Sequence, residues 1–148
     1  MPPFSALAAA FRTPDTDLIW KSNREGTRAL LAAVQAQAPA SRFILANTSN
    51  VYHPDQAHLG REDEAVSPEH AYPASKVAAE QEVHASVLTW TVLRFPFVYG
   101  DGEGHLEALP NHALASKWHP AMRMSTIHHR GSPRPCTWAW LAPWTATL

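Results

Sequence analysis

The sequence has a single cysteine, Cys136, among its 148 residues. One thiol excludes an internal disulfide framework and indicates the reducing cytoplasm. No apolar run reaches the length of a membrane span, and the first residues lack the charged start and apolar core of a signal peptide. The net charge is only −1 with histidine neutral, and lysine and arginine are not gathered on one face. We therefore expect a cytoplasmic protein that binds neither nucleic acid nor an anionic membrane.

Metal-ligand motifs are absent as well. The nine histidines include an adjacent pair, His128-His129, and three evenly spaced residues, His105, His112 and His119. Adjacent histidines point in different directions on most backbones, and the spaced ones have no cysteine or carboxylate partners in a recognisable pattern. We predict no metal site.

Two short apolar runs on either side of a helical pattern indicate the fold class. Arg42–Asn47 and Thr91–Phe95 are typical of buried strands, and the segment Ala74–Ser86 between them is typical of a helix. This order predicts a βαβ unit with parallel strands and a right-handed crossover. Ligands of open α/β sheets bind beyond the carboxyl ends of the strands, which is where Thr48 and Pro96 fall.

Tyr72 and Lys76 form the pair of residues with the clearest chemical meaning. Four residues apart on a helix, they share one face. An ammonium beside a phenol favours the phenolate, so we expect Lys76 to lower the pKa of Tyr72 from about 10 towards neutrality. Such a phenol exchanges a proton with a substrate oxygen while a hydride moves to or from a nicotinamide.

Four segments together resemble the extended short-chain dehydrogenase/reductase superfamily, the NAD-dependent epimerases and dehydratases. They are similar, in order, to the family's Asn-x-x-Gly-Thr helix, its catalytic Ser/Thr loop, its catalytic helix and its strand-end motif near the nicotinamide. The segments are Asn23–Leu31, Thr48–Tyr52, Tyr72–Lys76 with Glu80, and Arg94–Gly100. The resemblance covers about residues 6–130.

The resemblance implies a role for each matched residue. Tyr72 would be the general acid/base, and Thr48 would hydrogen-bond the reacting oxygen of the substrate. Lys76 would hold the nicotinamide ribose and lower the pKa of Tyr72. Ser22 and Pro96 would line the cofactor site together with Tyr72 and Lys76. The implied cofactor is NAD or NADP, and the implied substrate is a nucleotide sugar or a small alcohol or ketone.

The sequence departs from the family pattern in two places. Phe97 stands where many sugar epimerases carry an asparagine that touches the substrate, which favours a smaller alcohol or ketone. The Gly-rich turn that binds the cofactor pyrophosphate is missing, because the six glycines form no G-x-x-G-x-x-G or G-x-G-x-x-G motif. Residues 6–9 resemble the end of the family's fourth strand. We therefore expect an incomplete Rossmann-type doubly wound parallel sheet over residues 1–130, without the N-terminal Gly-rich βαβ unit.

Two functions are compatible with these observations. One is NAD(P)-dependent epimerisation, dehydration or dehydrogenation at a carbinol carbon through Thr48, Tyr72 and Lys76. The other is a catalytically inactive remnant of the family, or a module that forms a homodimer through the two helices that the family uses for pairing. The missing Gly-rich turn favours the second.

Residues 131–148 form an irregular tail with three tryptophans, three prolines and no periodicity. In a shifted reading frame, Trp138-Ala139 must encode Gly and Trp144-Thr145 must encode Asp. The shifted tail then reads as an amphipathic helix followed by an Asp-Gly turn. We predict that the reading frame slips near Arg130.

Overall fold

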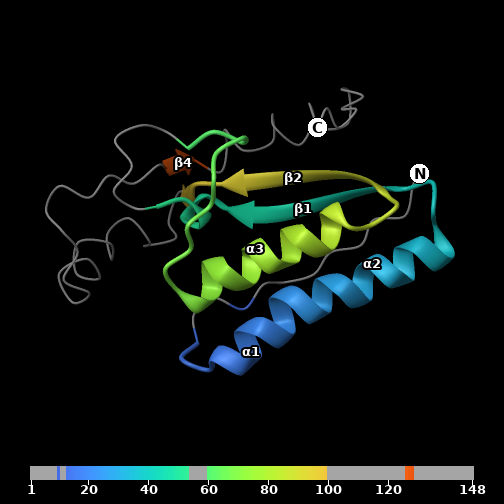
Figure 1. Cartoon of the computed structure of the whole chain (residues 1–148), viewed down its shortest axis with the longest axis horizontal. Coiled ribbons are helices and arrows are strands. Elements are labelled where there is room, and N and C mark those ends of the chain that lie inside the picture. The colour runs from blue at the N-terminus through green and yellow to red at the C-terminus, as the bar shows by residue number, and fades with distance from the viewer. Residues whose placement is uncertain (1–9, 11–12, 54–59, 100–125, 129–148) are drawn as a thin grey trace, which may run out of the picture.

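The computed structural model describes residues 10, 13–53, 60–99 and 126–128. Within them there are three α-helices. Figure 1 shows these helices beside the strands β1 and β2. The elements in chain order are α1 (Thr16–Trp20), the π-helix η1 (Lys21–Glu25), α2 (Gly26–Gln37), β1 (Arg42–Thr48), the 3₁₀ turn η2 (Ser49–Val51), α3 (Ala71–His84), β2 (Thr89–Phe95), β3 (Phe97–Tyr99) and β4 (Thr126–His128).

Strands β1 and β2 are parallel neighbours joined through α3, as the sequence predicts. Their register runs from Arg42 opposite Thr89 to Thr48 opposite Phe95, so the two carboxyl ends coincide. A second parallel pair joins β3 to β4. Helix α3 begins at Ala71, three residues before the predicted start, so Tyr72 lies inside its first turn.

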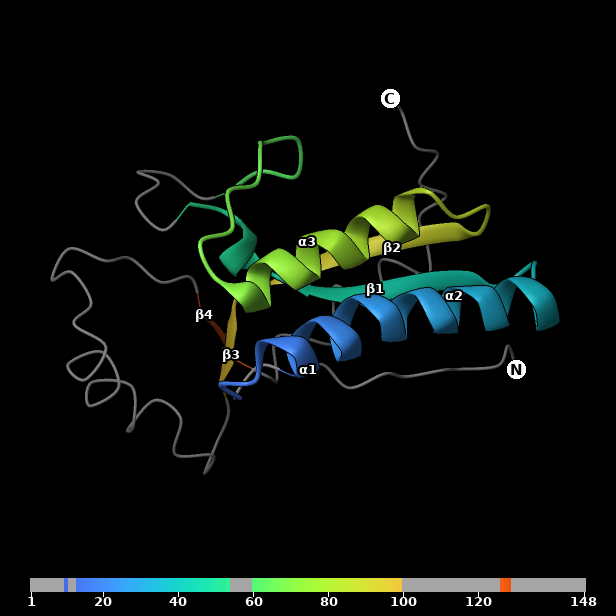
Figure 2. The same ribbon diagram turned by 60° about the horizontal axis from the view of Figure 1, so that its bottom comes forward.

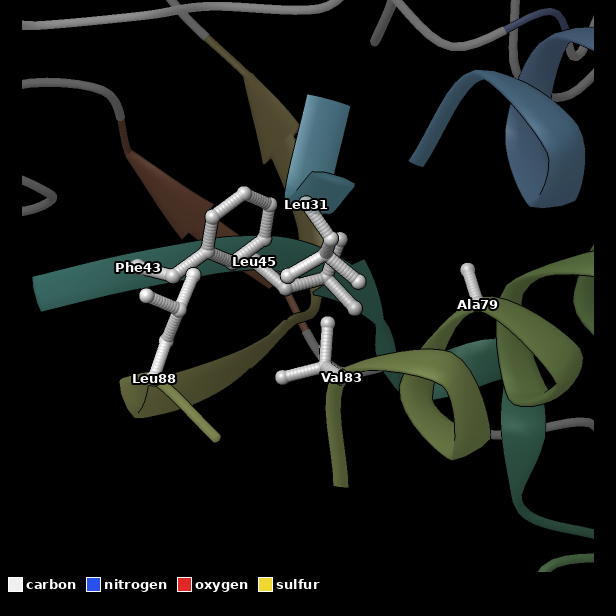
Figure 3. Packing of buried hydrophobic residues seen from close by; sticks show 6 residues of the cluster. All are labelled: Leu31, Phe43, Leu45, Ala79, Val83 and Leu88. Carbon is white, nitrogen blue, oxygen red and sulfur yellow. The ribbon is translucent and has the colours of Figure 1, made fainter. Parts of the chain in front are cut away.

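One face of the β1–β2 pair is covered by helices. Figure 2 shows α2 and α3 running side by side along the strands. Alternate residues of β1 are buried, because successive side chains of a strand point to opposite faces. Six apolar side chains fill the space between helices and strands (Figure 3): Leu31, Phe43, Leu45, Ala79, Val83 and Leu88.

The predicted α/β class with parallel strands is therefore confirmed. Among the described residues, no helix is long and apolar enough to cross a bilayer. The segment at residues 6–9 and the tail at 131–148 lie outside the described residues. The division at residue 130 and the frame slip accordingly stay predictions.

Candidate active site

Thr48 and Tyr72 meet at the carboxyl end of β1. Thr48 is the last residue of the strand, and its side chain hydrogen-bonds to the hydroxyl of Tyr72 on α3. Thr48 Oγ1 also accepts a hydrogen bond from the backbone N–H of Asn50 (3.2 Å), which opens the turn η2. The hydrogen bond lowers the pKa of Tyr72, which is the effect of an O–H that donates to the phenolate oxygen.

Lys76 lies one helical turn after Tyr72 and is buried, with 6% of its surface exposed. Its ammonium Nζ donates to the backbone carbonyl oxygen of Ala46 on β1 (2.7 Å). Burial lowers the pKa of Lys76 below its ordinary value, and the charge of Glu80 opposes that shift in part.

The expectation that Lys76 lowers the pKa of Tyr72 is wrong for this arrangement. Burial raises the pKa of Tyr72 above 10, and the hydrogen bond from Thr48 offsets this only in part. The physical reason is that the Lys76 ammonium is directed to the Ala46 carbonyl, while the phenol is bonded to Thr48. Tyr72 is thus a protonated phenol at neutral pH, which suits it to donate a proton.

Ser22 and Pro96, the other two predicted cofactor contacts, are both half-buried. Ser22 lies in the π-helix η1, a kind of irregularity that is frequent at functional sites. Pro96 follows the end of β2, one residue beyond the strand partner of Thr48. Pro96 therefore lies at the same end of the sheet as Thr48.

Asn23, next to Ser22, is a buried residue whose contacts the sequence did not predict. Its carboxamide binds both backbone groups of Ala10, accepting from the N–H and donating to the C=O (3.0 Å each). It also donates to Ser75 Oγ on α3 (2.9 Å), and Ser75 in turn donates to the carbonyl oxygen of Tyr72 (2.7 Å). Asn23 thus ties the chain at Ala10 to the first turn of α3.

A buried ion pair lies on the other side of Lys76. Arg94 of β2 binds both carboxylate oxygens of Glu80, one turn along α3 from Lys76, through Nε and Nη2 (2.8 Å each). Burial alone would raise the pKa of Glu80, but the hydrogen bonds and charge of Arg94 and the hydrogen bond from Asn47 hold it below the usual value. Both residues occur in the family-like motifs, but nothing in the spacing predicts their contact.

Tyr52 connects this ion pair to the loop that follows η2. Arg94 Nη1 donates to the Tyr52 hydroxyl, which donates to the Arg61 carbonyl oxygen (2.7 Å each). A Cβ atom on Gly60 would lie 2.5 Å from the Tyr52 ring, so only glycine allows this close approach of backbone to ring. The loop is thereby held against the end of β2.

Metal chemistry finds no support in the part of the chain that the structure describes. Those residues contain no group of three or more His, Cys, Asp or Glu side chains that could hold a metal ion. The evenly spaced His105, His112 and His119 lie outside them.

Comparison with known proteins places the chain in a family. The profile of the NAD dependent epimerase/dehydratase family matches residues 7–128. The chain belongs to this family. The predicted relationship to the epimerase/dehydratase branch of the short-chain dehydrogenase/reductases is therefore confirmed. No curated protein matches the chain significantly.

Solved structures show the same fold. A short-chain dehydrogenase/reductase superfamily protein from Agrobacterium tumefaciens with bound NAD is 22% identical, with a TM-score of 0.63 over 84% of this chain and 51% of that chain. The NAD dependent NDP-hexosamine 5,6-dehydratase TunA of tunicamycin biosynthesis is 20% identical, with a TM-score of 0.75 over 94% and 51%. The UDP-glucuronic acid 4-epimerase from Bacillus cereus in complex with NAD is 27% identical, with a TM-score of 0.56 over 64% and 32%.

The chain thus spans between about a third and a half of the length of these proteins. Their Rossmann-type fold confirms the predicted fold class, and the NAD bound to two of them confirms the family expectation of a nicotinamide cofactor.

Proposed function

We propose that this chain carries the nicotinamide-facing part of an NAD-dependent epimerase, dehydratase or dehydrogenase that acts at a carbinol carbon. The observation that carries the proposal is the hydrogen bond between Thr48 and Tyr72 at the carboxyl end of a parallel strand, with Lys76 one helical turn away. Open α/β sheets bind their ligands at this end of the strands.

The residues present fit the nicotinamide end of the cofactor. An ammonium has three N–H donors, and Lys76 uses one of them on Ala46, the one hydrogen-bond partner that the described residues provide. The remaining donors suit the ribose hydroxyls. The pyrophosphate end has no counterpart among the residues of this chain, because the sequence contains no Gly-rich turn.

Each residue of the site then has a role in proton movement. Tyr72, a protonated phenol, donates its proton to a substrate carbonyl oxygen as that group becomes an alcohol. In the oxidative direction Tyr72 accepts the alcohol proton only after it has lost its own proton to solvent. Thr48 holds the reacting oxygen next to Tyr72 Oη. When bound, the nicotinamide supplies the hydride acceptor and donor at the carbinol carbon.

Nucleotide sugars are the substrate class that we favour. Two of the similar structures have names that specify a nucleotide-linked sugar, UDP-glucuronic acid and NDP-hexosamine. A smaller alcohol or ketone is the alternative substrate for the same proton and hydride transfer. The reason is Phe97, half-buried at the start of β3, which stands where many sugar epimerases carry an asparagine.

Ligand binding tests the proposal without requiring turnover. Nicotinamide mononucleotide carries only the half of the cofactor that this site would hold, so its binding is measured by saturation-transfer NMR on the full chain. We expect saturation transfer to the nicotinamide and ribose protons of the mononucleotide. The Lys76→Met variant should bind the mononucleotide roughly tenfold or more weakly than the wild type, because a charged hydrogen bond is lost.

Lys21→Met is the matched control, because Lys21 is exposed in η1. This control should bind like the wild type. No saturation transfer in the wild type, or equal affinity in the two lysine variants, would contradict the proposal. That result would instead favour an inactive remnant or a pairing module.

A further inference from the structure

The carboxylate of Glu80 joins the two elements that carry the proposed site. Glu80 is 3% exposed and belongs to α3, which also carries Tyr72 and Lys76. Its Oε1 accepts from Asn47 Nδ2 on β1 at 2.6 Å. Since Asn47 immediately precedes Thr48, this short bond holds the carboxyl end of β1 against the helix.

Asn47 transmits that restraint to Thr48. Its side-chain Oδ1 accepts from the backbone N–H of Thr48 (2.8 Å), and its Nδ2 also reaches the carbonyl oxygen of Lys76 (3.3 Å). One buried carboxamide therefore binds the strand residue that contacts Tyr72 and the helix residue one turn after Tyr72. A shift of β1 along α3 would break these bonds together with the Thr48–Tyr72 hydrogen bond.

Arg94 makes a buried carboxylate possible at this position. Arg94 Nη2 donates to Oε2, which Asn47 leaves open, and Arg94 Nε shares Oε1 with Asn47. The exposed side-chain fractions are 18% for Arg94 and 4% for Glu80. Buried ion pairs contribute little net stability compared with well-packed apolar residues, because the desolvation of both charges offsets their attraction. Stability alone is thus a weak reason for a charged residue here, and its effect on neighbouring groups is the stronger one.

Several charged groups surround this position. Arg94 faces Glu80 from β2 and also contacts Tyr52. On α3 itself, His84 acts on Glu80 through its charge, and the charge of Glu80 acts on Lys76. From β1, Asn47 and the Ala46 carbonyl contribute neutral dipoles.

We propose that Glu80 is a positioning residue of the proton-transfer site, which fixes Thr48 against Tyr72 through Asn47 and places its negative charge one helical turn from the buried Lys76 ammonium. The first effect depends on its hydrogen bonds and the second on its charge. This inference rests on the proposed function, since the residues it positions are those of the proposed site.

The charge effect is tested by competitive acetylation of lysines across a pH series in the full chain, read by mass spectrometry. The chain has three lysines, and the exposed Lys21 serves as the internal reference for Lys76. Glu80→Gln keeps the shape of the side chain but removes its charge. We expect the labelling midpoint of Lys76 to move to lower pH by roughly one unit, because a nearby anion favours the ammonium.

Glu82→Gln is the matched control, because Glu82 lies on the same helix and pairs with the exposed Arg24. It should leave the midpoint of Lys76 unchanged. An unchanged midpoint in Glu80→Gln, or an equal shift in both variants, would overturn the charge effect. A purely structural role of Glu80 would not move this midpoint.

The hydrogen-bond effect is tested by amide hydrogen exchange at Thr48, measured by NMR. In the double variant Glu80→Leu/Arg94→Leu both charges are replaced by apolar groups, which avoids an unpaired buried charge and favours folding. We expect exchange at Thr48 to accelerate about fivefold or more relative to Val83 in the core, because the Asn47 carboxamide that accepts from the Thr48 N–H loses its hydrogen bond to Glu80. Unchanged protection at Thr48 would overturn the positioning role.

Neither measurement uses a cofactor. A chain that fails to bind nicotinamide mononucleotide would contradict the proposed function. The labelling midpoint of Lys76 and the amide exchange of Thr48 can still be measured in that chain. If the chain binds the mononucleotide but the Glu80 variants leave Lys76 and Thr48 unchanged, the role of Glu80 is contradicted and the proposed function is not.

Discussion

The interface between β1 and α3 has two ends, and each end is stabilised by a different kind of interaction. At one end apolar side chains from α2, β1 and α3 pack against each other, with Val83 fully buried among them. At the other end, toward the carboxyl end of β1, buried polar side chains are joined by short hydrogen bonds. These are Asn23, Asn47, Ser75, Lys76 and Glu80, with Arg94 half-buried beside them.

The difference shows what each end can do. Apolar packing has no preferred direction and scales with the area removed from water, so the apolar end supplies stability. The polar end needs a partner for every buried donor and acceptor, and it has few alternative arrangements. It holds Thr48, Tyr72 and Lys76 in one geometry at the place where ligands of such sheets bind.

Removal of Arg94 should have the largest effect on stability. Arg94→Ala leaves the buried Glu80 carboxylate without its cation, which should lower the free energy of unfolding by about 3–5 kcal/mol. Urea unfolding of the wild type and the variant measures the difference. Arg24→Ala breaks the exposed pair with Glu82 and should cost less than about 1 kcal/mol. Equal effects of the two variants would show that the polar end is not buried as described.

Truncation at the apolar end should affect stability but not the site. Val83→Ala removes two methyl groups from a fully buried side chain and should cost about 2–3 kcal/mol, including the cavity that it leaves. The affinity for nicotinamide mononucleotide should stay within the error of the wild type under conditions where the variant is folded. A loss of binding in folded Val83→Ala would show that the two ends are not separable.

Acid should weaken the polar end first, with a smaller effect. The pKa of Glu80 in the folded chain lies below its unfolded value of about 4.3. Its contribution to stability is therefore complete above the unfolded pKa and is lost as the pH falls through the folded pKa. Thermal unfolding between pH 7 and pH 3 should show a steeper loss of stability in the wild type than in Glu80→Gln. Parallel curves for the two proteins would contradict the assignment.

The sequence predicted the local elements of this arrangement but not the contacts between distant side chains. The parallel strands, the helix between them and the shared face of Tyr72 and Lys76 follow from local periodicity, and all three are present. The family resemblance implied that Thr48 binds the reacting oxygen, and its side chain does bond to Tyr72, while the catalytic roles of Thr48, Tyr72 and Lys76 stay predictions. Strand and helix limits moved by one to three residues because hydrogen bonding at the ends depends on neighbours.

Contacts between distant elements were not predictable in the same way. The bond from Asn47 to Glu80 spans 33 positions, and side-chain pairs at that separation leave no periodic signal in one sequence. The direction of the Lys76 ammonium was also missed, because its choice between Tyr72 and the Ala46 carbonyl depends on the packing of β1 against α3. The roles of Ser22 and Pro96 and the predicted homodimer stay predictions.

The central claim is that Tyr72 transfers the proton during nicotinamide-dependent chemistry. Its most direct test is a single-turnover experiment with excess chain, NAD and UDP-glucuronic acid at alkaline pH, where the Tyr72 phenol can lose its proton, followed by absorbance of the reduced nicotinamide. Tyr72→Phe should slow its formation by about 10²–10⁴-fold, because general acid/base catalysis contributes that much. Lys21→Met, which alters an exposed lysine of η1, should react like the wild type. Equal rates in wild type and Tyr72→Phe, or no reduction in a wild type that binds nicotinamide mononucleotide, would contradict the account.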